Sequence, residues 1–216
     1  MGQAERKGLG YMADVSDPAA LRDAWRDAHV SIRHQAEVEK EAVRSARALF
    51  SNPAEAQKKL APLLAAIEQR AATLQAEAKA FYQLQAEQRK APLGDLALSD
   101  VEKQLARLIP ERSGTSAKLS AEERAALQPK TGGAIPRHMT SELNALLGRT
   151  PKLTALEIRD FLTGEFEPIP ASEFLDYLRA SEKLGAMKLT VKPEEPPPAP
   201  PAPPAKKGGT KAGKRG

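Results

Sequence analysis

An apolar residue recurs every three or four positions between residues 60 and 81, and this spacing limits the fold more than any other feature. The positions of this seam are Leu60, Leu64, Ile67, Ala71, Leu74, Ala78 and Phe81. A mean spacing of about 3.5 residues is typical of a helix packed along its length against another helix. Pro62 removes one backbone hydrogen bond within the seam, so we expect a kink there or a helix that begins near it.

A second long helix is expected just before the first. In "SDPAAL", Asp17 is a good N-cap and Pro18 a good first helical residue. An apolar stripe then follows at Leu21, Trp25, Ala28 and Ile32. The segment "SNPAE" ends this helix and begins the next, with Asn52 as the cap. Two helices of roughly 30 to 35 residues, each about 50 Å long, must run antiparallel when so tight a turn joins them.

This predicted helical hairpin spans residues 16–90 and follows a flexible N-terminus at residues 1–15. Two helices alone bury too little apolar surface for robust stability, so we expect the hairpin to pack on a second copy or on another protein. The expected assembly interface consists of Leu60, Leu64, Ile67, Leu74 and Phe81.

Residues 91–135 are expected to be a linker that carries two short helices. Ser99 with Glu102, and Ser120 with Glu123, have the spacing of a capping box. We expect Pro110 to end the first of these helices.

A small domain is predicted at residues 136–192. Helices are expected at 140–147, 155–163 and 170–184, and strands at 152–154 and 186–191, with Gly164 ending the middle helix. Together with the hairpin, this makes the chain mainly α-helical.

The phrases "LTALEIRDFL" and "FLDYLRASEKLGAMKL" resemble the second helix, and the third helix with the first wing strand, of a winged helix-turn-helix domain. The resemblance covers roughly 55 of the 216 residues and implies a third helix that contacts DNA or a protein. Pro193 follows the last strand almost at once, so the second strand of the wing is missing. A three-helix bundle that ends in extended chain is the alternative.

Charge on the last helix favours a protein partner over DNA. Its exposed side carries Glu173, Asp176 and Glu182 against Arg179 and Lys183. DNA binding depends on cations that neutralise phosphates, and this surface has a net negative charge. We therefore expect Glu173, Asp176, Arg179 and Lys183 to bind a protein partner.

The net charge of +5 belongs to residues 196–216, which contain five cations and no acidic residue. They are part of the C-terminal tail at residues 193–216, which is predicted to be disordered. Eight of the 18 prolines lie between Pro193 and Pro204, which favours an extended spacer. The cations beyond it are Lys206, Lys207, Lys211, Lys214 and Arg215. They are expected either to bind nucleic acid without sequence preference or to serve only as a solubilising terminus.

No pattern in the sequence predicts catalysis, a cofactor or a metal. The chain has no cysteine, which excludes thiolate chemistry and fits a reducing compartment, so we expect a cytoplasmic protein. His29 and His34 precede Glu37 and Glu41 in the reverse of the di-iron order, which favours a solvated helix face. All paired carboxylates are likewise expected on solvated faces. No apolar run is long enough to span a membrane.

These features together predict a non-catalytic helical interaction or scaffolding protein, which assembles through its hairpin and docks a protein partner through its C-terminal domain. Two alternatives remain open. One is a DNA-associated winged-helix protein that uses its basic tail, and the other is a structural subunit of a phage or cell-envelope complex.

Overall fold

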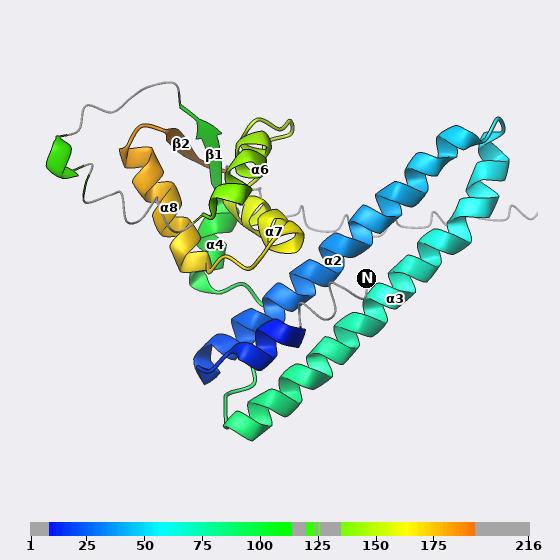
Figure 1. The fold of residues 1–216 in the computed structure, drawn as a ribbon, viewed down its shortest axis with the longest axis horizontal. Coiled ribbons are helices and arrows are strands. Elements are labelled where there is room, and N and C mark those ends of the chain that lie inside the picture. Colours follow the sequence, from blue (N-terminus) through cyan, green and yellow to red (C-terminus); the bar gives the residue numbers. More distant parts are fainter. Residues whose placement is uncertain (1–8, 114–119, 124, 126–134, 193–216) are drawn as a thin grey trace, which may run out of the picture.

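The computed structural model describes residues 9–113, 120–123, 125 and 135–192 and shows a mainly helical chain with a two-stranded sheet (Figure 1). Residues 9–14 are helical. The elements that follow are η1 (Pro18–Ala20), α2 (Leu21–Ser45), η2 (Ala46–Leu49), α3 (Pro53–Arg89), α4 (Asp100–Arg107), β1 (Leu108–Arg112), α6 (Arg137–Leu147), α7 (Ala155–Glu165), α8 (Ala171–Lys183) and β2 (Met187–Val191).

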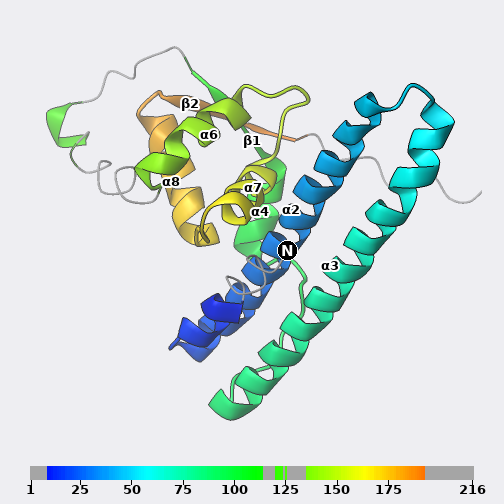
Figure 2. The ribbon, with the colours of Figure 1, turned by 45° about the vertical axis from the view of Figure 1, so that its right-hand side comes forward.

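Helices α2 and α3 lie side by side along their length and form an arm, to which η2 and the turn after it belong (Figures 1 and 2). The first helical turn of the arm and helix α3 each begin at an N-cap residue that the sequence predicted. The Asp17 carboxylate accepts a hydrogen bond from the backbone N–H of Ala19 at 2.9 Å, and the Asn52 side chain accepts one from Ala54 at 2.9 Å. Helix α3 continues through Pro62 without a break. Because Lys58 is exposed, water can bind the carbonyl that Pro62 leaves without a helical partner.

The arm has a hydrophobic core only near its base. Trp25 of α2 stacks on Tyr82 of α3, with ring centroids 4.5 Å apart. Met12 is fully buried in the same core, so at least residues 9–14 are a packed helix, which differs from the flexible N-terminus expected over residues 1–15. The apolar side chain of Met12 covers surface that α2 and α3 alone would leave exposed.

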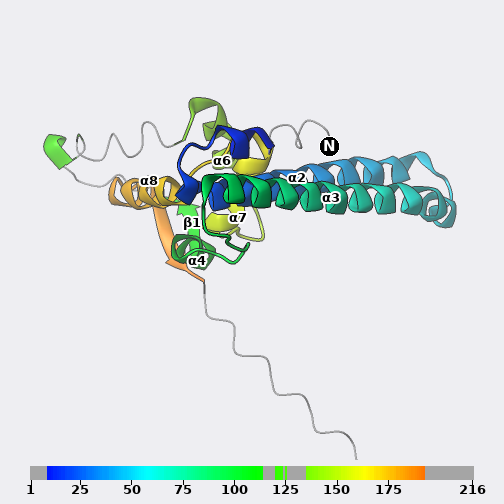
Figure 3. The ribbon, with the colours of Figure 1, turned by 90° about the horizontal axis from the view of Figure 1, so that it is seen from below.

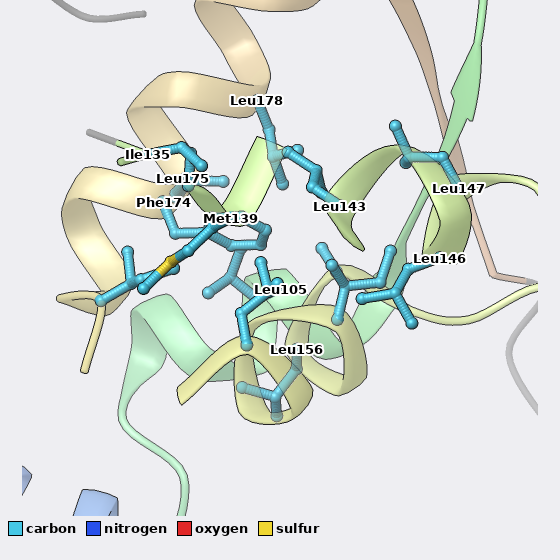
Figure 4. Close-up of a cluster of buried hydrophobic side chains, with 14 of the residues drawn as sticks. Leu105, Ile135, Met139, Leu143, Leu146, Leu147, Leu156, Phe174, Leu175 and Leu178 are labelled. Atoms are coloured by element: carbon cyan, nitrogen blue, oxygen red, sulfur yellow. The ribbon is translucent and has the colours of Figure 1, made fainter. Parts of the chain in front are cut away.

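A second core joins α4, α6, α7 and α8 into the C-terminal domain (Figure 4). Its fully or almost fully buried side chains include Leu105, Met139, Leu143, Leu146, Ile158, Leu162, Phe174 and Leu178. Helix α8 contributes Phe174 and Leu178 from one face.

The structure places α4 and β1 inside this domain, whereas the sequence suggested a linker over residues 91–135. Leu105 of α4 has no exposed surface and lies at the centre of the core (Figure 4). A helix of eight residues is marginal in isolation, and packing on α7 and α8 provides the stability that it lacks.

Strand β1 pairs antiparallel with β2, in a register that sets Pro110 opposite Leu189. The expectation that Pro110 ends a helix is therefore wrong, since α4 already ends at Arg107 and Pro110 lies in a strand. A two-stranded sheet has only edge strands, where proline is tolerated. The partner of β2 thus precedes it in the chain, and no strand forms at residues 152–154, where Thr154 instead caps α7.

The arm and the C-terminal domain meet where α2 packs on α7, so that α2 lies between α3 and α7 (Figure 1). The view from below shows α2 and α3 running together along the arm (Figure 3). Gly164 lies within α7, which continues to Glu165, so the expectation that this glycine ends the helix is wrong. A Cβ atom at Gly164 would lie 2.4 Å from Cβ and Cγ of His34 on α2. The glycine thus permits the close approach of two helices.

Among the described residues, the structure contains no helix with both the length and the apolar character needed to cross a lipid bilayer.

Candidate functional site

The contact between α2, α4 and α7 is built from charged side chains, all of which are buried except the half-buried Arg22. We call this set the ion network, and its members are Arg22, Arg26, Asp27, Glu102, Arg159 and Asp160. Three guanidinium groups face three carboxylates, so the ion network is close to neutral. Buried charges are tolerated in proteins when they are paired in this way.

Arg26 of α2 connects all three helices. Its Nη1 and Nη2 donate to Oδ1 and Oδ2 of Asp160 at 3.0 Å each, which is a bidentate pair with α7. Its Nε lies 2.6 Å from Oε1 of Glu102 on α4. Only 6% of Arg26 is exposed, so these contacts are shielded from water and from salt.

Arg159 of α7 makes the reciprocal contact. Its Nη2 lies 2.7 Å from Oδ1 of Asp27 on α2, and its Nε donates to the carbonyl of Ile169 at 2.7 Å. Oδ1 of Asp27 therefore has the Arg159 guanidinium as its ion-pair partner.

The two buried carboxylates respond differently to this environment. Burial raises the pKa of Asp27 to about 6, against the opposing effect of Arg159. Burial also acts to raise the pKa of Glu102, but hydrogen bonds from Ser99 and the charge of Arg26 outweigh it, and that pKa is lowered. Glu102 has this support because it is also the acceptor of the capping box at the start of α4.

Arg22 extends the ion network to the segment between α3 and α4. Its Nη1 lies 3.1 Å from Oε2 of Glu102, and its Nε donates to the carbonyl of Asp95 at 3.2 Å. The Tyr82 hydroxyl accepts a hydrogen bond from the backbone N–H of Gly94 at 2.6 Å. This segment is therefore tied to both helices of the arm.

Sequence reasoning missed the ion network, because it assigned paired carboxylates to solvated faces, and this is wrong for Asp27, Glu102 and Asp160. A signal was present: "AWRDAHV" in α2 and "EIRDFL" in α7 each place an Arg-Asp pair among apolar residues. Two such helices can form reciprocal Arg–Asp ion pairs across a shared interface.

The seam that was expected to drive assembly is divided between two environments. Leu74 is buried in the core of the arm against α2, and Ile67 and Phe81 pack partly against it. Leu60 and Leu64 are half-buried and lie outside that core. Between residues 37 and 66, all of which are described, Ala56 alone is buried. The outer half of the arm therefore has little core of its own.

The outer half also exposes large apolar side chains. Leu49 at the turn is 85% exposed, Leu63 on α3 is 53% exposed, and Val38 on α2 is 46% exposed. The C-terminal domain packs near the base of the arm and does not cover this part (Figure 2).

Helix α8 carries the expected partner-binding residues, and all four are exposed: Glu173, Asp176, Arg179 and Lys183. Tyr177, which lies between them in the sequence, is half-buried. Arg179 donates to the Gln104 side chain of α4 at 2.9 Å, which holds its guanidinium beside that helix. The tail cations Lys206, Lys207, Lys211, Lys214 and Arg215 lie outside the described residues.

The histidines of α2 are not gathered with other metal-ligand residues. Nε2 of His34 lies 3.0 Å from Oε2 of Glu165, and its ring meets the edge of Phe161. The described residues contain no group of three or more side chains arranged to hold a metal ion.

No family model matches the sequence, and comparisons with curated proteins and with solved structures gave no match.

Proposed function

We propose that the protein is a non-catalytic helical interaction protein, which assembles through the outer half of its arm and docks a protein partner through α8. The observation that carries this proposal is the lack of a core in the outer half of the arm, residues 37–66, where Ala56 is the one buried residue.

The physical argument concerns what a pair of helices can bury. An apolar side chain gains roughly 1.5 to 3 kcal/mol when it leaves water completely. Leu49 and Leu63 remain mostly exposed, and Leu60 and Leu64 are half-buried. A second arm laid against the first, as in a four-helix bundle, would cover all four leucines at once.

The C-terminal domain supplies the second half of the proposal. We propose that it is winged-helix-like, on the basis of three packed helices, α6 to α8, followed by a strand that is paired in a sheet. The outer face of α8 carries both signs of charge on exposed side chains, which suits a charged protein surface better than the DNA backbone.

The decisive test of assembly is the molar mass in light scattering of the full chain and of Leu49→Asp and Leu63→Asp variants. Both side chains are more than half exposed, so the variants should fold. We expect a multimeric wild type and monomeric variants, because a buried carboxylate opposes association. Ala65→Asp is the matched control, since Ala65 is exposed on α3 and lies outside the seam. A monomeric wild type, or variants with unchanged mass, would contradict assembly through the arm.

Docking through α8 is tested separately by capture of proteins from the native host with Glu173→Lys and Arg179→Glu variants. We expect the partner to be lost from both and retained by Lys103→Glu, an exposed substitution on α4. Partner capture that is unchanged by both α8 variants would remove α8 from the proposal.

A second candidate function is non-specific nucleic acid binding by the tail, favoured by five cations with no acidic residue between Lys206 and Gly216. It predicts that deletion of residues 205–216 weakens binding to any duplex and that affinity falls steeply with salt. Absence of a gel shift with the full chain at about 50 mM salt would exclude this function.

A further inference from the structure

A cavity of about 370 Å³ lies beside the ion network, where the two cores meet. Its walls come from the N-terminal helix with the residue after it, from α2, from the start of α4, from α7 and from the turn between α7 and α8. This volume falls within the range that small-molecule sites occupy, and junctions between packed units are common places for such sites.

Two polar side chains that line the cavity can accept further hydrogen bonds. The buried Tyr11 hydroxyl has no hydrogen-bond partner within the described residues, and the buried Oδ1 of Asp27 contacts Nη2 of Arg159 at 2.7 Å. Both residues line the cavity, and Asp27 is only 6% exposed. Buried polar groups in folded proteins are almost always hydrogen-bonded, so the unpartnered Tyr11 oxygen calls for a donor, and a carboxylate oxygen can accept a second hydrogen bond beside its contact with Arg159.

The charged residues that line the cavity indicate that the donor is a cation. The carboxylates of Asp14, Asp23, Asp27 and Glu102 line the cavity, with the guanidinium groups of Arg26 and Arg159. Carboxylates thus outnumber guanidinium groups by two. The pKa of Tyr11 is raised to about 12, first by burial and then by the negative charges of Glu167 and Asp27. A negative potential in a partly desolvated space favours a cation.

The rest of the cavity wall is largely apolar and built from small side chains, which include Val15, Ala24, Pro168 and Ala171. A bare metal ion would leave this wall unused, and the space is far larger than one ion. A ligand with one cationic end and a short aliphatic body matches both surfaces.

We propose that this cavity binds a small organic cation, namely a primary ammonium group on a short aliphatic chain. The ammonium donates to Oδ1 of Asp27 and to the Tyr11 oxygen, and the aliphatic body lies against the wall of Val15, Pro168 and Ala171. An ammonium has three donors and no acceptor, which suits the unpartnered Tyr11 oxygen and a carboxylate oxygen that can accept a second hydrogen bond. The proposal is independent of assembly through the arm.

The test is a titration of the full-length protein with n-butylamine, and with n-butanol as the uncharged probe of equal length, followed by amide chemical shifts in two-dimensional NMR. We expect saturable shifts at Tyr11, Ala24 and Ala171 with n-butylamine, and no saturable shift with n-butanol. Tyr11→Phe and Asp27→Asn should each weaken the amine by about tenfold, the equivalent of one strong charged hydrogen bond.

Asp100→Asn is the matched control, because Asp100 is an exposed carboxylate of α4 that does not line the cavity. It should bind n-butylamine as the wild type does. Binding should also weaken between pH 7.5 and pH 5, since a proton on Asp27 competes with the amine. Tyr11→Phe keeps the aromatic ring, so its result stands even if Asp27→Asn is poorly folded.

Three results would overturn the proposal. They are equal saturation by n-butanol, unchanged amine affinity in folded Tyr11→Phe and Asp27→Asn variants, and no saturable shift with n-butylamine up to about 20 mM, a concentration that detects even millimolar affinity.

Discussion

Arg26 is the residue on which the contact between the arm and the C-terminal domain most depends. It is bidentate to Asp160 and also contacts Glu102, and both carboxylates are mostly buried. Loss of one partner from a buried ion pair leaves an uncompensated charge in a medium of low dielectric constant, and this costs about 3 to 5 kcal/mol.

Arg26→Met should therefore lower the free energy of unfolding by about 3 to 5 kcal/mol, measured by urea denaturation. Arg33→Met is the matched control. Arg33 lies 3.8 Å from the same Asp160, but its side chain is 60% exposed, so its loss should change stability by less than about 1 kcal/mol. Equal effects of the two substitutions would show that burial of Arg26 does not matter.

Asp27 gives the ion network an unusual dependence on pH. Its pKa is about 6 in the folded protein and about 3.9 in an unfolded chain. Between pH 4 and pH 6 the folded state therefore binds more protons than the unfolded state, and the contribution of Asp27 to stability is lost as the pH rises.

Asparagine resembles the protonated acid at every pH, so Asp27→Asn should gain stability relative to wild type as the pH rises from 4 to 7. The gain should be on the order of 2 to 3 kcal/mol. Urea unfolding at several pH values measures it, and the difference from wild type cancels the other titrating groups. Parallel curves for the two proteins would contradict the raised pKa.

At the scale of single elements, the distance between α2 and α7 depends on Gly164. Alanine normally stabilises a helix relative to glycine by about 1 kcal/mol. At Gly164, however, the added Cβ would lie 2.4 Å from the first atoms of the His34 side chain, close to the α2 backbone. These atoms cannot swing away as the end of a flexible side chain can, so the helices must separate.

Gly164→Ala should therefore destabilise the protein by about 1 to 3 kcal/mol, as overpacking does elsewhere. Gly148→Ala is the control, because its Cβ would come no closer than 3.4 Å to the Ala145 carbonyl oxygen, at the end of α6. Adding His34→Ala to Gly164→Ala should recover part of the loss in a double-mutant cycle. A stabilising Gly164→Ala would show that α2 and α7 are not in close contact there.

Elements governed by neighbouring residues were predictable from the sequence, and elements governed by distant ones were not. The capping box at Ser99 forms, and Ser120 and Glu123 exchange the same two hydrogen bonds, because a cap needs only residues three positions apart. Strand β1 was not predicted, because its pairing with β2 depends on a segment far along the chain. Gly164 was assigned to a helix end for the same reason, since only the position of His34 reveals its role.

The same limit applied to the ion network. Arg26 and Asp160 look like ordinary surface charges until α2 and α7 are placed together. Composition and periodicity predict which face of a helix is apolar, but they do not reveal which charged residues of the other faces will pair. For this reason the mainly helical class was predictable, and the place where the two cores join was not.

At the scale of the whole molecule, two hydrophobic cores are joined by the packing of α2 on α7 and by the ion network. One core lies between α2 and α3, and the other lies in the C-terminal domain. Trp25 is the single tryptophan of the chain and belongs to the first core, so its fluorescence reports on the base of the arm. Helical circular dichroism reports on both cores together.

Leu178→Ala tests whether the two cores unfold as one unit. Leu178 is fully buried in the C-terminal core (Figure 4), whereas Trp25 belongs to the core of the arm, and truncation of Leu178 should cost about 2 to 5 kcal/mol. If the ion network couples the cores, Trp25 fluorescence and circular dichroism should shift together to a lower urea midpoint, with coincident curves. Leu74→Ala in the arm should produce the same coincidence from the other side. A Trp25 transition that stays at the wild-type midpoint in Leu178→Ala would mean that the arm folds independently, because the buried charges between α2 and α7 would then not transmit the loss of packing.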